Sequence, residues 1–166
     1  MTIRVRCCAV LLICLLAFTC SSSTAVAQTT EASSAKVAQL LHGFGTPFTQ
    51  KTPAVWYMDY NGKHLKDFRV ILAVEGDLLV SFVTVAPKAR IQTTPDFMHK
   101  VMRLNSRLDR VKIGLDSDED LFVRIDSSVR IMDADEFKQV IDQLAAATDD
   151  VYDDLSAFIT PPTSAK

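Results

Sequence analysis

The chain has 166 residues, with 18 Lys and Arg against 20 Asp and Glu, and a formal net charge of −2. Neither a basic cluster nor aromatic residues interleaved with basic ones occur, so we expect no nucleic-acid partner. A domain of this size buries about two-thirds of its unfolded surface, which is enough for one hydrophobic core.

Residues 1–27 have the three parts of a secretory signal peptide. The charged start contains Arg4 and Arg6, and the apolar run is residues 7–18. The expected cleavage site is Ala25-Val26-Ala27, directly before Gln28. The apolar run spans about 18 Å at roughly 1.5 Å per residue, short of a hydrocarbon core about 30 Å thick. A cleaved signal is therefore favoured over a retained membrane anchor. We expect export to the periplasm or, as the alternative, to the extracellular medium.

All four cysteines precede the expected cleavage site, at positions 7, 8, 14 and 20. Cleavage after Ala27 would leave no disulfide and no thiol chemistry in the mature chain. The alternative is a lipoprotein that is acylated on Cys20, although Phe18 and Thr19 stand where a lipobox has small residues. Because one acyl chain binds membranes only marginally, we expect a membrane partner only if Cys20 is lipidated.

No internal repeat, linker or second composition regime divides the remaining sequence. We expect residues 28–34 to be a flexible leader, residues 35–160 to form a single domain and residues 161–166 to be a disordered tail.

The first half of this domain is predicted to be a helix followed by an antiparallel meander. Helical spacing predicts a helix over 34–44, which Gly43 and Gly45 would end, and a loop with two prolines follows at 46–53. Alternation then predicts strands at 54–60, 68–74 and 78–85. The turns predicted between them are at Asn61-Gly62 and Glu75-Gly76-Asp77.

The second half of the domain begins and ends with a helix. Thr94-Pro95 is typical of a helix start, and apolar residues continue at spacings of three and four to Leu108. Period-two strands are predicted at 111–115 and 121–125, and Asp133 would cap a last helix that runs to Phe158, about 37 Å long. The predicted order is α-β-β-β-α-β-β-α. It indicates an α+β fold with an antiparallel sheet, one face covered by helices and the other more open.

Five stretches resemble a known family. They are Val101-Met102-Arg103-Leu104-Asn105, Val111-Lys112-Ile113, Leu121-Phe122-Val123-Arg124-Ile125, Asp133-Ala134-Asp135-Glu136-Phe137 and Asp149-Asp150-Val151-Tyr152-Asp153-Asp154-Leu155. With them the chain resembles the YbjN-type domain of the type III secretion chaperone-like superfamily, and the meander with Trp56 fits the same architecture. The resemblance implies an α+β fold, often dimeric, that offers a surface to another polypeptide and has no enzyme activity. Some members are described as regulators. Secretion chaperones proper are cytoplasmic, so the expected export sets this chain apart.

No constellation of residues predicts an enzyme. The G-x-S-x-G and P-loop patterns are absent, and the mature chain would lack a cysteine nucleophile. His42, His64 and His99 stand apart from other plausible ligands, without an H-x-x-x-H spacing. We therefore expect no catalytic residue, no cofactor and no metal site.

Two groups of acidic residues could each be a binding site or a solvated part of the surface. Residues 116–120 place Asp at alternate positions, as a Ca²⁺ loop would, but Leu121 and Ser127 stand where an EF-hand needs Gly and Glu, so a solvated hairpin tip is favoured. Asp149, Asp150, Asp153 and Asp154 could form a docking stripe for a basic partner or a weak cation site. A solvated helix face is the favoured interpretation of this second group.

Four residues are candidates for a partner surface. Trp56, Met58 and Tyr60 share one face of the first strand, which could be the open face or, as the favoured alternative, the core. Asn105 could bond to a partner or, as the favoured alternative, satisfy backbone at the junction of helix and strand. The leading hypothesis is an exported non-enzymatic protein that binds a polypeptide or a second copy of itself, or acts as a regulator. The alternative is a periplasmic sensor of a small ligand or a cation.

Overall fold

The computed structural model describes residues 22–161, with side chains from residue 28 onward. Its helices and strands are, in chain order, α2 (Ser22–Phe44), β1 (Thr49–Thr52), β2 (Val55–Asn61), β3 (Asp67–Glu75), β4 (Leu78–Ala86), α3 (Pro95–Arg107), β5 (Lys112–Leu115), β6 (Leu121–Ser128) and α4 (Ala134–Leu155). Short 3-10 turns, η1 (Lys88–Arg90), η2 (Val129–Ile131) and η3 (Ser156–Phe158), follow β4, β6 and α4. The apolar part of the expected signal peptide, with Cys20, and the last five residues lie outside the described range.

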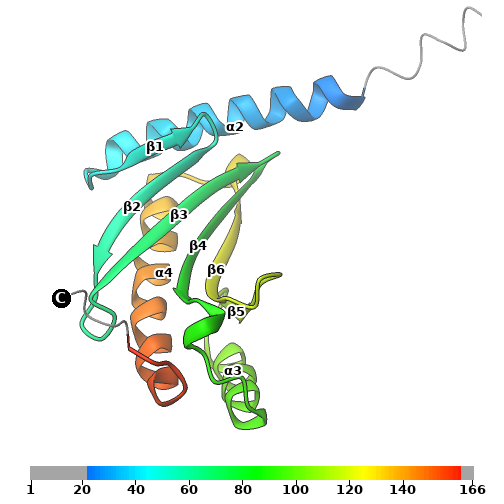
Figure 1. Ribbon diagram of the computed structural model, residues 1–166. Coiled ribbons are helices and arrows are strands. Elements are labelled where there is room, and N and C mark those ends of the chain that lie inside the picture. The colour runs from blue at the N-terminus through cyan, green and yellow to red at the C-terminus, as the bar shows by residue number, and fades with distance from the viewer. Residues whose placement is uncertain (1–21, 162–166) are drawn as a thin grey trace, which may run out of the picture.

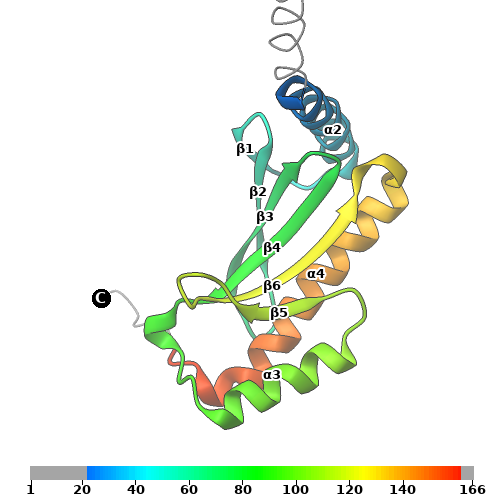
Figure 2. The ribbon, with the colours of Figure 1, turned by 90° about the vertical axis from the view of Figure 1, so that its right-hand side faces the viewer.

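The strands form one six-stranded antiparallel sheet in the order β1-β2-β3-β4-β6-β5. Helix α4 runs along one face of this sheet, α2 crosses one end of it, and α3 packs against β5 and α4 (Figures 1 and 2). The predicted α+β class, with an antiparallel sheet and a long C-terminal helix, is confirmed.

Both predicted helix starts have the expected caps. The Thr94 hydroxyl accepts a hydrogen bond from the Phe97 N–H at 3.2 Å, and the Asp133 carboxylate accepts one from the Glu136 N–H at 2.8 Å. Each bond satisfies a donor that the first turn of a helix would otherwise leave without a partner. These caps fix where α3 and α4 begin, and therefore which helix positions meet the sheet.

The core lies between the sheet and α4. Along β3 every second residue from Phe68 to Val74 is buried, and the residues between them are exposed or half-buried. The α4 side of this core is built from residues at helical spacing, which are Phe137, Val140, Ile141, Leu144, Val151 and Leu155. The alternation shows that one face of the sheet is sealed by α4 and the other is not.

One expectation about the elements was wrong, and two helices differ in detail from the prediction. The segment Thr49–Thr52 is the edge strand β1 and not a loop; all four of its side chains are exposed, so no apolar alternation marks it. Residues 28–34, the expected flexible leader, lie within α2, which begins before the helix start predicted at residue 34. The predicted last helix to Phe158 is present as α4 to Leu155, continued by the 3-10 turn η3 to Phe158.

Among the residues that the structure describes, no helix has both the length and the apolar character needed to cross a bilayer.

Candidate functional site: the open face of the sheet

The structure buries two of the three β2 residues that were candidates for a partner surface, in agreement with the favoured interpretation. Trp56 and Met58 are fully buried, at 0% exposure, and lie in the core beneath α4. Tyr60 is half-buried and stacks on Phe68, with ring centroids 5.8 Å apart. Burial and the nearby Asp142 raise the pKa of Tyr60 to about 12. The alternative interpretation, that these residues belong to the core, is confirmed for Trp56 and Met58, because α4 covers the face they occupy.

The opposite face of the sheet is the open face. Cross-strand pairing brings a group of mostly apolar side chains together on this face, which are Val55, Tyr57, Ile71, Ala73, Val80, Phe82 and Phe122. No helix of the described chain covers this face (Figure 2), and most of these side chains are half-buried. Aromatic and aliphatic residues in such a position are typical of protein-binding surfaces. Period-two alternation identified the two faces, but it did not tell which of them α4 would cover.

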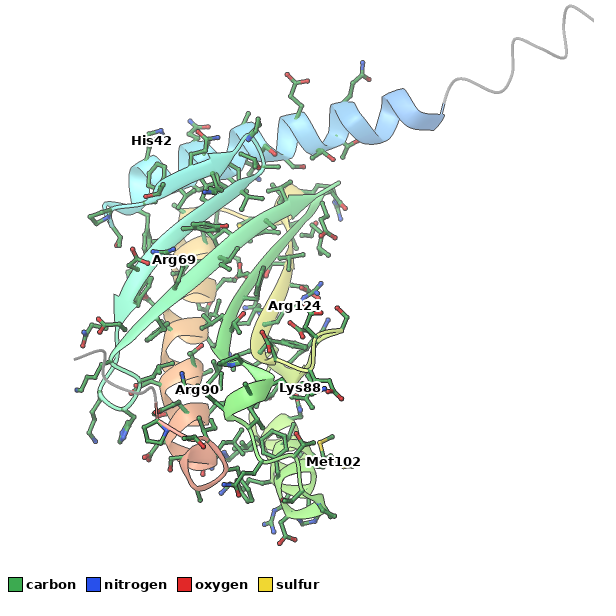
Figure 3. All side chains as sticks on the ribbon, viewed as in Figure 1. His42, Arg69, Lys88, Arg90, Met102 and Arg124 are labelled. Atoms are coloured by element: carbon green, nitrogen blue, oxygen red, sulfur yellow. The ribbon has the colours of Figure 1, made fainter. Side chains whose placement is uncertain are left out.

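One end of the open face carries an ion pair. The Arg69 guanidinium donates two hydrogen bonds to the Asp59 carboxylate, at 2.7 and 3.2 Å, and lies over the Tyr57 ring, 5.3 Å from its centroid. The hydrogen bond from Arg69 lowers the pKa of Asp59. An aromatic ring and two opposite charges therefore meet at the rim, at the position of Arg69 in Figure 3.

The other end carries a three-residue cluster. The carboxylate of Asp126 accepts hydrogen bonds from Arg124 at 2.5 Å and from Lys112 at 2.6 Å. Burial alone would raise the pKa of Asp126, but these two cations together lower it. The apolar centre of the open face is therefore flanked on both sides by charges that are already paired.

Asn105 has the structural role that was its favoured interpretation. Its side-chain amide donates to the Ile113 carbonyl at 2.8 Å and to the Val101 carbonyl at 3.2 Å, and its oxygen accepts from the Ile113 N–H at 2.9 Å. Because both amide donors are used within the chain, the prediction of a partner contact through Asn105 is not supported. The amide occupies the place that a neighbouring strand would take at the outer edge of β5.

A second surface lies on α3. Met98 and Met102, one helical turn apart, are 42% and 69% exposed. Both lie beside the core stripe of Phe97, Val101 and Leu104. Methionine adapts to irregular partners, so this exposed pair is a candidate contact. Apolar residues next to the core stripe of α3 were the sequence signal that could have revealed it.

The acidic residues of α4 bind other parts of the same chain. The Asp149 carboxylate accepts three backbone N–H bonds from the β2–β3 loop, His64 Nδ1 lies 3.1 Å from Asp153, and Asp154 pairs with Lys100 at 2.9 Å and with Arg107 at 2.5 Å. Asp149 and Asp154 are thus bonded within the chain, whereas Asp150 is exposed and the Asp153 side chain is 60% exposed, as expected of a solvated helix face. The carboxylates of Asp149 and Asp154 fasten the β2–β3 loop and α3 to the end of α4.

The loop of residues 116–120 is likewise bonded internally. The Asp116 carboxylate accepts from the backbone N–H groups of Asp118 and Asp120, and Asp120 accepts from the N–H of Lys88. In the described range, no group of three or more His, Cys, Asp or Glu side chains could hold a metal ion. The three histidines are not brought together either, since His64 pairs with Asp153 and His42 packs edge-on against Phe48.

The expected cleavage site lies within α2, because Ala25, Ala27 and Gln28 are all helical. The first side chains of this helix described as buried are Ser33 and Ser34, followed by Val37 and Leu41.

The sequence model of the YbjN family, described as "Putative bacterial sensory transduction regulator", matches residues 58–157. The chain belongs to the YbjN family. The match runs from within β2 to the end of α4, so it includes the helix that covers one face of the sheet and the open face apart from Val55 and Tyr57. A search of curated proteins gave no match.

Solved structures with a similar fold include YbjN-type and type III secretion proteins. YbjN from E. coli is 14% identical, with a TM-score of 0.53 over 75% of this chain and 93% of that one. The ExoU–SpcU heterodimeric complex of the Pseudomonas aeruginosa type III secretion system contains a chain 13% identical, with a TM-score of 0.54 over 72% and 97%. A chain of the ExsC–ExsE complex is 11% identical, with a TM-score of 0.58 over 76% and 95%. These likenesses show that the chain shares the fold of these proteins.

Proposed function

We propose that this YbjN-family chain is an exported, non-enzymatic protein that binds a polypeptide partner through the open face of its sheet. The observation that carries the proposal is the uncovered apolar centre, where Tyr57, Ile71 and Phe82 are directly opposed on three neighbouring strands. Half-buried aromatic and aliphatic side chains with satisfied charges around them provide the apolar core and polar rim of a protein interface.

The comparisons support the binding class. Two of the solved structures with this fold are complexes of two different proteins, ExoU–SpcU and ExsC–ExsE. The family description as a regulator also suits a protein that acts by binding. No arrangement of residues in the described part of the chain suggests a reaction.

The expected export is compatible with the fold. Cleavage after Ala27 would keep the described packed part of α2, which begins at Ser33 and includes Val37 and Leu41. The mature chain would lack cysteine, and the observed core contains no cysteine side chain. Fractionation of cells, with detection of the N-terminus by mass spectrometry, tests this part of the proposal. A retained residue 1 in the cytoplasmic fraction would contradict it.

The binding itself is tested by a pull-down with the C-terminally tagged protein from the exported fraction of its own cells. We expect a stoichiometric polypeptide partner that is lost with the double variant Ile71→Ser, Phe82→Ser, whose two side chains are directly opposed. The matched control is Ile131→Ser in η2, an exposed apolar residue that is not among the residues of the open face. Thermal melting of each variant separates lost binding from lost folding. Recovery of the bait alone would contradict the proposal.

A second copy of the chain is the other candidate partner, and the exposed pair Met98 and Met102 favours it. The pair lies on α3, which packs against the edge strand β5. Sedimentation analysis of the protein and of Met98→Ser, Met102→Ser tests this version. We expect a dimer that the substitutions dissociate; a monomer at all concentrations would contradict it.

A further inference from the structure

The sheet is split between two of its central strands. β3 pairs with β4 only from Ile71 to Glu75, opposite Leu78 to Phe82. Before Ile71, β3 keeps only its pairing with β2, and after Phe82, β4 keeps only its pairing with β6. In Figure 1 the two strands diverge from their shared turn, and α4 is visible behind the opening. A register irregularity between Thr84 and Ala86 lies at the divergent end of β4, and such a bulge bends a strand.

The backbone groups beside this split can be assigned from the ladder. The Val74 N–H donates to the Ala54 carbonyl on the β2 side, so even-numbered residues of β3 direct their backbone groups toward β2. Asp67 and Arg69 therefore direct theirs toward β4. Because the turn has two residues, Glu75 and Leu78 form a hydrogen-bonded pair. Every second residue of β4 from Leu78 to Thr84 therefore directs its backbone groups toward β3.

Arg69 and Thr84 are the pair that would follow Ile71 and Phe82 if the ladder continued. Instead, no backbone hydrogen bond between described residues crosses the opening at this level. A pair of strand edges with unused donors and acceptors is a template for another extended chain.

A cavity of about 510 Å³ occupies the split. It lies in the range of roughly 300–1,000 Å³ that ligand sites usually have. Its lining includes side chains of the β2–β3 loop, both strand edges and α4, among them His64, Lys66, Arg69, Thr84, Arg90 and Tyr152. The cavity is thus walled by the same strand segments that lack a neighbour.

The charge of this cavity favours an acidic occupant. Lys66 and Arg90 line it, against the single carboxylate of Asp67, while the charge of Arg69, which also lines it, is already paired with Asp59. Arg90 donates through Nε to the Thr160 carbonyl at 2.8 Å, while its Nη2 is buried without an acceptor among the described residues. A carboxylate brought by a ligand would supply a partner for this guanidinium.

We propose that the split between β3 and β4 receives an extended, acidic segment of the partner polypeptide. Its backbone bonds to the edges at Arg69 and Thr84, and an acidic side chain lies against Arg90 and Lys66. This inference rests on the proposed polypeptide-binding function and names the segment of the partner that is held and where. Main-chain bonds supply affinity in such strand addition, and the side-chain pocket supplies specificity.

The test uses ¹⁵N-labelled protein, expressed from its own start codon, and two peptides of about ten residues that alternate Glu with Val or Lys with Val. We expect the Glu peptide to shift the Arg69 and Thr84 amide resonances and slow their hydrogen exchange, and to bind at least about tenfold more tightly than the Lys peptide. No binding by the Glu peptide would overturn the inference. Equal binding of both peptides, or the same shifts with inorganic phosphate alone, would overturn it too.

Thr84→Pro isolates the backbone contribution. Proline at this position removes an N–H that faces the split and leaves the β6 ladder intact, and proline is tolerated where the lost N–H faces an open edge. Binding should fall at least about tenfold relative to Thr84→Ala, which keeps the N–H. If Thr84→Pro does not fold, Arg90→Gln provides the second variant, for which we expect a similar loss.

The residues whose amide resonances shift on peptide binding distinguish this inference from the proposed function. If the peptide shifts Tyr57 and Phe82 on the open face but leaves Arg69 and Thr84 unchanged, the split is not the site, whereas polypeptide binding stands. If the pull-down recovers no partner but the Glu peptide enters the split, the open-face function fails and the split remains an acceptor for extended acidic chains.

Discussion

Gly62 leaves the space that the carboxylate of Asp149 occupies. A Cβ at position 62 would overlap the Asp149 side chain and lie 2.7 Å from the Leu65 carbonyl oxygen. The carboxylate accepts backbone N–H bonds from Lys63 at 3.1 Å and from His64 and Leu65 at 2.8 Å. A turn between two strands and a helix 84 to 86 residues later in the sequence therefore fit together at one point.

We expect Gly62→Ala to destabilise the fold by about 1–3 kcal/mol, because the added methyl group displaces the carboxylate from its three donors. Urea unfolding measures the difference. The matched control is Gly43→Ala near the end of α2, where a Cβ would meet nothing within 4 Å. That substitution should be neutral or slightly stabilising, since Ala favours helix. Equal effects of the two substitutions would contradict the role given to Gly62.

The loop contact should also depend on pH. Burial, the largest single influence, raises the pKa of Asp149, but the N–H groups of Leu65, His64 and Lys63 together hold it below its ordinary value of 3.8. A carboxylate whose pKa is lowered by folding stabilises the fold above the unfolded-state pKa, and this contribution is lost as the pH falls through the folded-state pKa.

Accordingly, Asp149→Asn should be less stable than the parent protein near neutral pH, and the difference should shrink below about pH 3.8. Unfolding curves recorded across this range measure it. Asp150→Asn, the exposed neighbour, is the control and should show a much smaller difference. A difference between Asp149→Asn and the parent that does not change with pH would argue against the ionised carboxylate as the cause.

Asn105→Ala should cost about 1–2 kcal/mol, because the N–H and the carbonyl of Ile113 both lose their partner. The exchange rate of the Ile113 amide should rise at the same time. Ser106→Ala changes the exposed neighbouring position and should leave both quantities unchanged. An unaltered Ile113 exchange rate in Asn105→Ala would show that the amide does not protect the edge of β5.

Trp56→Ala should cost about 3–5 kcal/mol, since it leaves a large void in a core where Trp56 is fully buried. Tyr57→Ala, on the opposite face, should cost about 1 kcal/mol and keep the cooperative transition. Thermal unfolding with a probe that does not depend on Trp56, such as far-UV circular dichroism, compares the two. The reverse order of stabilities would mean that the covered and open faces have been exchanged.

The sequence predicted the elements whose signals are local. Thr94 and Asp133, as N-cap residues, predicted the starts of two helices, and the alternation from Phe68 to Val74 predicted a strand. β1 was missed because its exposed residues, such as Gln50 and Lys51, show no apolar period and stand between prolines. The placement of Trp56 under α4, and of Tyr57 on the open face, depends on where a helix begun 78 residues later comes to pack, which no local pattern encodes.

The candidate sites depended even more on distant contacts. Asp149 and Asp153 formed an acidic group in the sequence, but their partners lie in the β2–β3 loop, which only the folded chain brings near. The split at Arg69 and Thr84 is a matter of strand pairing, and both residues had the period expected of an ordinary ladder. Sequence reasoning gave the class of the fold and the expectation of a binding role, while the surfaces that could perform it required the register of the sheet.

The two outer edges of this sheet are poor templates for growth. β1 is four residues long, fully exposed and followed by Pro53, and β5 is occupied by the amide of Asn105. Unsatisfied strand edges are instead found inside the sheet, beside Arg69 and Thr84. A chain received there is enclosed by a strand on each side and offers no new edge to the next molecule. Such an arrangement limits assembly to complexes of fixed stoichiometry and counteracts the polymerisation to which exposed β-edges are prone.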